Sequence, residues 1–263
     1  MNFSVFDYTY PISSLFDSFK SSVRGKKPYV SQDSITVNSE LASLMTQKNI
    51  QDMLNSNLVI IKLLEDNKLP IKADINNFMQ TTYKHSLDTK EKAIGIYNSL
   101  PIDLKAQANL EYIQKGALLH DIGKVFIPQS VLNKDGKLNE RETNIMHLHS
   151  KLSEAMLATQ NVKPEVINIV KYHHQNHKQT GYPEINGSIY GYDLNTEIVA
   201  LADKYSALTE QRSYKKALTP LEALDVIKVS VDNGEINPRV YNALVGYINN
   251  SLKKVDDLQK SVA

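Results

Sequence analysis

The sequence predicts an all-α fold, and three observations support this prediction. Apolar residues recur at three- and four-residue steps over most of the chain after about residue 38, which is the spacing of one helix face. Thr219–Pro220 and Asn237–Pro238 each join a helix-capping residue to a proline suited to the first helical position. No strand-rich region, internal repeat or low-complexity tract interrupts the pattern.

Residues 1–70 read as an N-terminal helical appendage of unknown role. We expect loops with one short helix at about 12–19, followed by helical structure over about 38–65. The polar residues before Pro70 end that pattern. Residues 71–263 are then predicted to form one larger domain.

The larger domain is predicted to be a bundle of consecutive helices. They lie at about 74–99, 103–121, 139–159, 164–175 and 196–209, with a sixth opening at Pro220 and a seventh running from Pro238 to about residue 254. Turn residues at Asn133–Gly136 mark a connection over 122–138, and a polar, glycine-containing loop spans 176–195.

The composition excludes several classes of protein. A formal net charge of +1 does not favour binding along a nucleic-acid polymer, which usually needs a basic patch. The absence of cysteine excludes disulfides, thiolate zinc sites and cysteine nucleophiles, so any metal must be held by His, Asp, Glu or water. No apolar run reaches about 18 residues, and the N-terminus lacks a signal-peptide pattern, so we expect a cytoplasmic protein without a membrane span.

The run Ala117–Lys124 joins an apolar helix end to a His-Asp pair. Buried polar groups need hydrogen bonds or a metal, and His120 with Asp121 offers one nitrogen and one carboxylate ligand. Gly123 lets the chain leave the helix, and Lys124 adds a cation where an anionic substrate could lie. The pair alone is equally consistent with a helix C-terminus capped by histidine, so the other histidines must decide.

The other histidines supply partners for this pair. His149 shares an apolar helix face with Leu152 and is expected to point inward, whereas His147 falls on the opposite face and is expected to be a surface residue. His173 and His174 repeat the pattern of polar residues at a helix end. A lone inward histidine is more often structural than a ligand, so it is the whole set that indicates a metal site.

Seven residues occupy inward or terminal positions of five successive predicted helices: His85, His120, Asp121, His149, His173, His174 and Asp203. Five imidazoles and two carboxylates suit two metal ions that share a carboxylate, and such ligands accept iron, manganese or zinc. Two ions about 3.5–4 Å apart can hold the attacking and leaving oxygens of phosphoryl transfer.

In their order along the chain, these motifs resemble the HD-GYP branch of the HD superfamily of metal-dependent phosphohydrolases. The resemblance covers about 73–250 and rests on His85, His120–Lys124, Ile127–Leu138, Ile145–His149, His173–His174, Gly181–Pro183 and Ala202–Thr209, with Arg212, Tyr214 and Lys215.

The resemblance implies an HD-domain helical bundle that acts as a bacterial cyclic di-GMP phosphodiesterase, producing the linear dinucleotide and often GMP. It assigns the seven residues above as ligands of two divalent metal ions, iron or manganese first and zinc as an alternative, with Asp121 as the bridge. Lys124 is implied to contact the scissile phosphate and Arg212 and Lys215 the other phosphate. The substrate rim is assigned to Thr180, Gly181, Tyr182 and Pro183.

The implied mechanism needs no side-chain nucleophile. A water bridging two cations has a lowered pKa, so hydroxide forms near neutral pH and attacks phosphorus in line. Lys124 balances the negative charge of the transition state, and Asp121 is expected to help orient the water.

Five positions depart from the branch's usual pattern, and none is one of the seven ligands. Gln175 replaces a Glu, Lys178–Gln179 replaces Asp-Gly, Ser206 replaces an Asp and Asp88 replaces an Arg. Thr81 stands where some relatives have a Glu that holds a third metal, so we expect two ions.

Two other functions remain open from the sequence. One is a weakly active or inactive module that binds a cyclic dinucleotide, or docks a partner through residues 176–195. The other is a phosphohydrolase of another cyclic dinucleotide or of a mononucleotide. The complete ligand set favours catalysis, because docking needs no ligands. A homodimer or a GGDEF-type partner protein is also left open.

Overall fold

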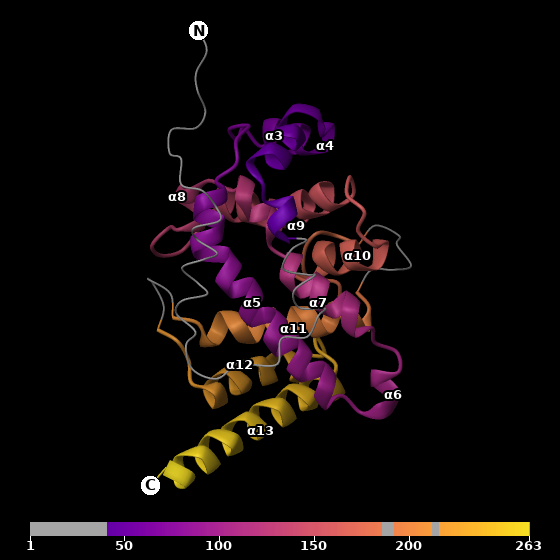
Figure 1. The fold of residues 1–263 in the computed structure, drawn as a ribbon, viewed down its shortest axis with the longest axis vertical. Coiled ribbons are helices and arrows are strands. Elements are labelled where there is room, and N and C mark those ends of the chain that lie inside the picture. Colours follow the sequence, from indigo (N-terminus) through magenta and orange to yellow (C-terminus); the bar gives the residue numbers. More distant parts are fainter. Residues whose placement is uncertain (1–40, 186–191, 212–215, 263) are drawn as a thin grey trace. The chain divides into compact units, whose positions relative to one another are not determined.

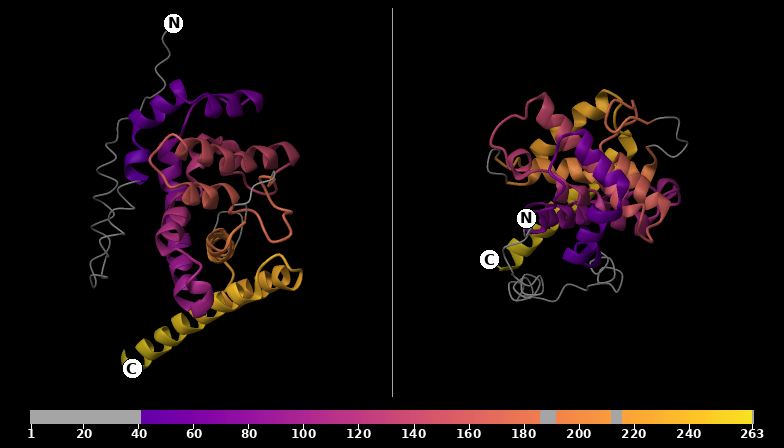
Figure 2. Two further views of the ribbon diagram at one scale, coloured as in Figure 1. Left: turned by 90° about the vertical axis from the view of Figure 1, so that its right-hand side faces the viewer. Right: turned by 90° about the horizontal axis from the view of Figure 1, so that it is seen from above.

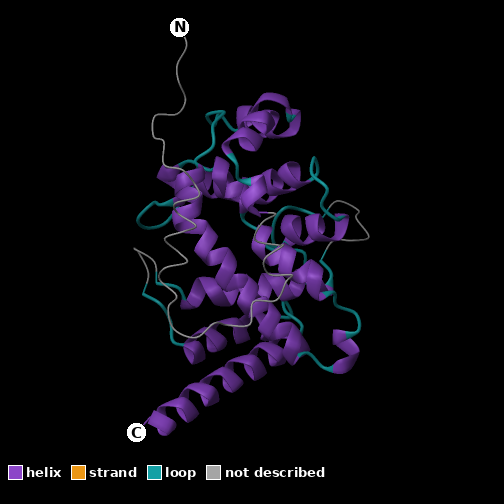
Figure 3. Ribbon diagram, viewed as in Figure 1, coloured by secondary structure: helices purple, strands orange, loops and turns teal. Residues whose placement is uncertain are grey.

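The predicted all-α class is confirmed. The protein is described by a computed structural model over residues 41–185, 192–211 and 216–262, and these residues contain helices, turns and loops without a strand (Figure 3). Nothing in these ranges forms a helix with both the length and the apolar character needed to cross a bilayer. The short helix expected at about 12–19 lies outside the described residues.

The helices follow the predicted order closely (Figure 1). They are α3 (Gln47–Ser56), α4 (Leu58–Asp66), α5 (Ile75–Ser99), α6 (Ile102–Lys105), α7 (Leu110–Leu119), the 3-10 helix η1 (Ile122–Phe126), α8 (Gln129–Leu132), α9 (Glu140–Leu157), α10 (Pro164–Tyr172), α11 (Leu194–Thr209), α12 (Pro220–Asp232) and α13 (Pro238–Val262).

The prediction of a single helix over 103–121 is wrong, because a non-helical segment separates α6 from α7. The Asn109 side chain caps the new helix by accepting the N–H of Tyr112 at 3.1 Å. The backbone N–H of Asn109 donates to the side chain of Asn195, on α11, at 2.7 Å. A long-range partner therefore stabilises a helix start that local periodicity does not reveal.

The helical stretch expected at 38–65 is likewise divided. Asn57 caps α4 by accepting the N–H groups of Val59 and Ile60, each at 3.2 Å. Its side-chain amide donates to the carbonyl of Ala155 on α9 at 2.9 Å. Residues 47–66 thus pack on the larger helical body, and the domain boundary near residue 70 stays a prediction.

The predicted start of α12 is confirmed in detail. Thr219 accepts the backbone N–H of Glu222 at 3.3 Å, and the Glu222 carboxylate accepts the N–H of Thr219 at 2.8 Å. Pro220 occupies the first helical position. This reciprocal capping box satisfies two amide groups that a helix N-terminus otherwise leaves unpaired.

Helix α5 lies at the centre of the core and contacts α7, α11 and α13. Figure 2 shows α13 crossing one end of α5, and α11 also packs against α5. Ile96 on α5, Ile113 on α7 and Ala202 on α11 are fully buried in one apolar cluster. The arrangement brings polar residues of α5, α7 and α11 to the edge of this core.

Helices α7 and α10 approach closely at Gly116. A Cβ atom at this position would lie 2.5 Å from Cγ2 of Ile169, so only glycine fits the contact as it stands. Both helices end in a histidine cap, His120 after α7 and His173 after α10. Close packing at Gly116 therefore helps to bring these two imidazoles together.

Two departures from the branch's pattern contact each other between α5 and α11. The Ser206 hydroxyl donates to Asp88 Oδ2 in a short hydrogen bond. The other oxygen of Asp88 accepts from Lys92 Nζ at 2.9 Å. A polar link between the two helices therefore persists although both residue types differ from the usual Arg and Asp.

Gly116→Ala should lower the free energy of unfolding by about 1–3 kcal/mol, because overpacking pushes α7 from α10. Gly246→Ala is the matched control. A Cβ atom at position 246 would meet only Ser99 Cβ, at 4.0 Å. The Gly246→Ala substitution should therefore raise the free energy of unfolding by about 0.5–1 kcal/mol, because alanine has a higher helix propensity than glycine. Urea unfolding followed by circular dichroism measures both, and an unchanged midpoint for Gly116→Ala would contradict the tight contact.

Ser206→Asp should destabilise the chain by at least about 2 kcal/mol, because it places a buried carboxylate against Asp88. Asp88→Arg combined with Ser206→Asp should recover much of this loss by forming an ion pair. A double-mutant cycle by thermal unfolding measures the coupling. Additive single effects would show that the two positions do not interact.

Candidate metal centre

The seven predicted ligands converge on one centre built by five helical elements. The ends of α7 and α10 supply His120, Asp121, His173 and His174, while α5, α9 and α11 supply His85, His149 and Asp203. All are buried except His174, whose side chain is 25% exposed. Both predicted helix-end pairs therefore lie at helix C-termini, and His149 points inward as expected.

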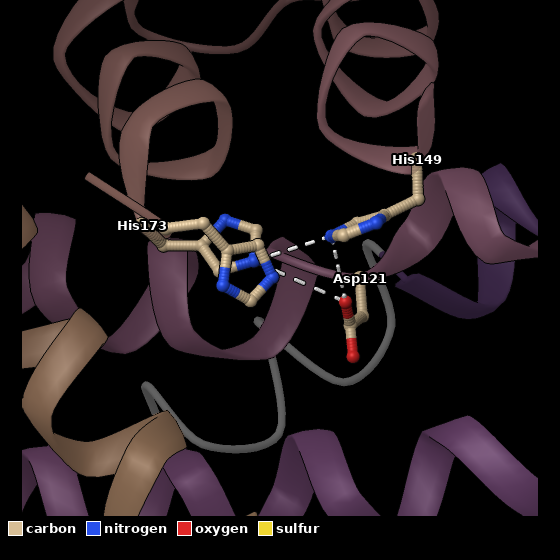
Figure 4. Close-up of side chains that lie close together, drawn as sticks. Asp121, His149 and His173 are labelled. Carbon is tan, nitrogen blue, oxygen red and sulfur yellow. Dashed lines mark hydrogen bonds and ion pairs between the residues drawn. The ribbon is translucent and has the colours of Figure 1, made fainter. Parts of the chain in front are cut away.

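Asp121 connects two sets of histidines, and Figure 4 shows the side of its carboxylate that faces His149 and His173. Its Oδ1 lies 3.3 Å from Nε2 of His149 and 4.0 Å from Nε2 of His173. Its Oδ2 lies 3.2 Å from Nε2 of His120 and 2.6 Å from Lys124 Nζ. The two oxygens thus face different ligand groups, which is the geometry that a bridging carboxylate requires.

Asp203 is the second carboxylate near Nε2 of His120. Its Oδ1 is 2.7 Å from Nε2 of His85 and 3.7 Å from Nε2 of His120, and its Oδ2 is 4.0 Å from Nδ1 of His174. Within the described residues, three overlapping groups have ligand atoms within 4.8 Å of one another. These are Asp121 with His149, His173 and His174; His85 with His120 and Asp121; and His120 with His173 and Asp203.

Backbone carbonyls orient three of the imidazoles. Nδ1 of His120, His149 and His173 lies 2.8, 2.6 and 2.8 Å, respectively, from the carbonyl oxygen three residues earlier. Donation from Nδ1–H directs the Nε2 atom of each ring into the centre, where it can bind a metal once the ring is neutral. This outer hydrogen bond is the usual way in which a protein fixes a metal-binding histidine.

The electrostatics also suit metal ligands. Burial lowers the pKa of His149 to about 4 and that of His173 to about 3, so both rings are neutral near pH 7, the form that binds metal. Burial also opposes charge on His120, but Asp121 and Asp203 outweigh it and raise its pKa to about 10. These carboxylates therefore attract positive charge to the centre.

Nε2 of His120 and Oδ1 of Asp121, which lie near each other's residues at the centre, are buried without a hydrogen-bond partner. An unsatisfied buried donor or acceptor costs about 1–3 kcal/mol, and more for a charged group. Cations in contact with both atoms would remove this cost. The neutral nitrogens of His149 and His173, the ionised carboxylates and these two atoms together fit first-row divalent ions.

A cleft of about 390 Å³ opens onto one side of the centre. His85, Asp121 and Lys124 line it together with Thr81 and Glu210. Lys124 therefore lies beside both the cleft and the Asp121 carboxylate. Arg212 and Lys215, predicted to contact the other phosphate, lie outside the described residues.

Tyr182 lies against the centre on the side of His174. The two rings stack with centroids 4.5 Å apart, and His147 stacks on Tyr182 at 3.6 Å. His147 stays partly exposed, as predicted, but the expectation that it is only a surface residue misses its contact with Tyr182. Helix periodicity correctly separates it from His149, but the loop containing Tyr182 returns to cover it, and no local signal announces that contact.

Gln175, which stands where the HD-GYP branch usually has Glu, holds the loop that contains Tyr182. Its side-chain nitrogen donates to the carbonyl of Pro183 at 2.6 Å, and its oxygen accepts the N–H of Gly181 at 3.2 Å. An ionised Glu could make only the second bond. Gly181 itself approaches closely, since a Cβ there would lie 2.0 Å from the carbonyl oxygen of His174. Thr180 is exposed and bonds to Asn176 at 2.9 Å.

Sequence comparisons agree with this geometry. A model of the HD domain family matches residues 77–240, more than half of the chain and a range that contains all seven predicted ligands. The chain is similar to a 3'3'-cGAMP-specific phosphodiesterase of Vibrio cholerae, with 30% identity over 167 residues. It is also similar to a cyclic di-GMP phosphodiesterase of Pseudomonas aeruginosa, with 32% identity over 167 residues.

These alignments cover 63% and 62% of this chain but 38% of each relative, so the chain spans about two fifths of their length. Among solved structures, the fold resembles the HDG"Y"P protein Bd1817 of Bdellovibrio bacteriovorus with a TM-score of 0.52 and 13% identity. That likeness covers 92% of this chain and 79% of the other and concerns the fold alone.

The family match extends over the same helices that gather the His and Asp side chains, and it includes the His-Asp pair and the Gly-Tyr-Pro element in their expected order. The chain therefore belongs to the HD domain family, within its HD-GYP branch.

Proposed function

We propose that the chain is a metal-dependent phosphodiesterase that hydrolyses cyclic di-GMP to the linear dinucleotide and onward to GMP. The observation that carries the proposal is the convergence of seven His and Asp side chains on one centre, two of which, His85 and Asp121, line the adjoining cleft. The named activities of the relatives, on cyclic di-GMP and 3'3'-cGAMP, support a cyclic dinucleotide as the substrate class.

Two cations are proposed, because the oxygens of Asp121 face separate histidine groups. When bound, such ions supply Lewis acidity to phosphate oxygens and activate a water. Iron or manganese is the proposed identity, with zinc as the alternative, since N and O ligands accept all three.

The protein's own groups have distinct roles in this proposal. Asp121 would contribute one oxygen to each cation, and Lys124 presents a positive charge at the cleft, where it would offset the charge developing on the phosphate. Tyr182 packs on His174 and keeps that ligand in place. The substrate is still predicted to contact Thr180–Pro183, Arg212 and Lys215.

A second cyclic dinucleotide, 3'3'-cGAMP, is the alternative substrate, because a relative of similar identity is named for it. A cytoplasmic location and a homodimer or GGDEF-type partner also stay predictions. A weakly active binding module is the remaining alternative, and measured turnover separates it from the enzyme.

The purified chain loaded with Fe²⁺, Mn²⁺ or Zn²⁺ should convert cyclic di-GMP to linear product, as followed by chromatography. His120→Ala combined with Asp121→Ala should abolish turnover, because it removes the bridge and one nitrogen ligand. Parallel reactions with 3'3'-cGAMP decide the preferred substrate. If wild type and the double variant form equal amounts of product with every metal, the proposed enzymatic activity is refuted.

His149→Ala should release about one metal equivalent, because Nε2 of His149 points at Asp121. His147→Ala is the matched control on the same helix. The His147→Ala variant should retain both metal ions. Because it removes the ring that stacks on Tyr182, it should loosen Tyr182 and raise KM. Metal analysis by mass spectrometry measures both, and the same metal content in the two variants would contradict the helix-face assignment.

A further inference from the structure

His85 differs from the three histidines that backbone carbonyls orient. Its Nε2 faces the centre, 2.7 Å from Asp203 Oδ1. Its Nδ1 is buried and has no well-aligned hydrogen-bond partner. A carboxylate oxygen of Glu210 nevertheless lies 3.4 Å from this Nδ1, at the long end of hydrogen-bond distance.

The chemistry of a metal-binding imidazole gives this contact a role. If Nε2 of His85 binds a cation, the ring proton must reside on Nδ1, where it needs an acceptor because the atom is buried. Leaving that N–H unpaired would weaken binding, whereas a carboxylate acceptor fixes the ring and raises the basicity of Nε2. Glu210 Oε2 is positioned to be this acceptor.

Helix α11 places Glu210 in this position. Glu210 directly follows the last residue of α11, and its backbone N–H donates to the carbonyl of Ser206 at 2.9 Å, which ties it to the helix end. The same helix carries Asp203. α11 therefore contacts both nitrogens of the His85 ring, with Asp203 on the Nε2 side and Glu210 on the Nδ1 side.

We propose that Glu210 is a positioning residue that accepts the Nδ1–H of His85 and so sets the affinity of the ion on the His85–Asp203 side of the centre. It acts through His85 and contacts neither substrate nor ion in this role. The inference rests on the proposed metal centre but is independent of which phosphoester the centre hydrolyses.

The test measures Mn²⁺ and Zn²⁺ affinity by competition with a fluorescent chelator, using full-length wild type, Glu210→Ala and Glu210→Gln. Glu210→Ala should weaken one of two binding events by about 10–100-fold. Glu210→Gln should lose less, because its amide oxygen still accepts the hydrogen bond. Glu165→Ala, which removes an exposed carboxylate from α10, is the matched control and should bind like wild type.

A double-mutant cycle with His85→Ala separates positioning from a general structural effect. In the His85→Ala background, Glu210→Ala should cause no further loss of affinity, because its target is gone. If Glu210→Ala binds metal as tightly as wild type, or if it loses the same affinity in the wild-type and His85→Ala backgrounds, the inference about Glu210 is overturned while the proposed metal centre stands. Absence of Mn²⁺ and Zn²⁺ binding by wild type would overturn both the inference and the proposed metal centre.

Discussion

The shared carboxylate of Asp121 is the constraint on which the centre depends. It is buried beside His120, with one oxygen facing His149 and His173 and the other facing His120 and Lys124. A carboxylate in such a position is costly unless opposite charge surrounds it. The neighbouring His120 and Lys124 overcome the effect of burial and hold its pKa well below the usual range, so it stays ionised and available.

The surrounding helices are arranged to meet that constraint. α7 and α10 each end where a histidine must turn inward, and their close contact at Gly116 sets the distance between these ends. Three imidazoles obtain their orientation from carbonyls of their own chain segments, so the helix geometry alone aims their Nε2 atoms. His85 is aimed by groups from another helix, which makes its position depend on how α5 packs against α11.

Three of the departures from the branch's pattern, at Gln175, Asp88 and Ser206, are accommodated by local hydrogen bonds. Gln175 uses its amide to hold both ends of Gly181–Pro183, a combination that an ionised Glu could not provide. Asp88 and Ser206 face each other, and their hydrogen bond joins the two departing positions. Gln179 adopts a positive φ of 56°, a conformation that costs little for glycine and more for other residues. The loop beside the centre is therefore maintained by different side chains.

Much of this protein was readable from sequence because its signals are local. Apolar periodicity, capping residues and prolines located most helices, and the His-Asp motifs marked the residues that now lie together. The breaks at Asn57 and Asn109 were not readable, because each depends on a hydrogen bond to a residue far along the chain. The stacking of His147 on Tyr182 and the approach of Glu210 to His85 have the same origin. Such contacts exist only when separate helices and loops pack, since nothing in either segment alone specifies the distance between them.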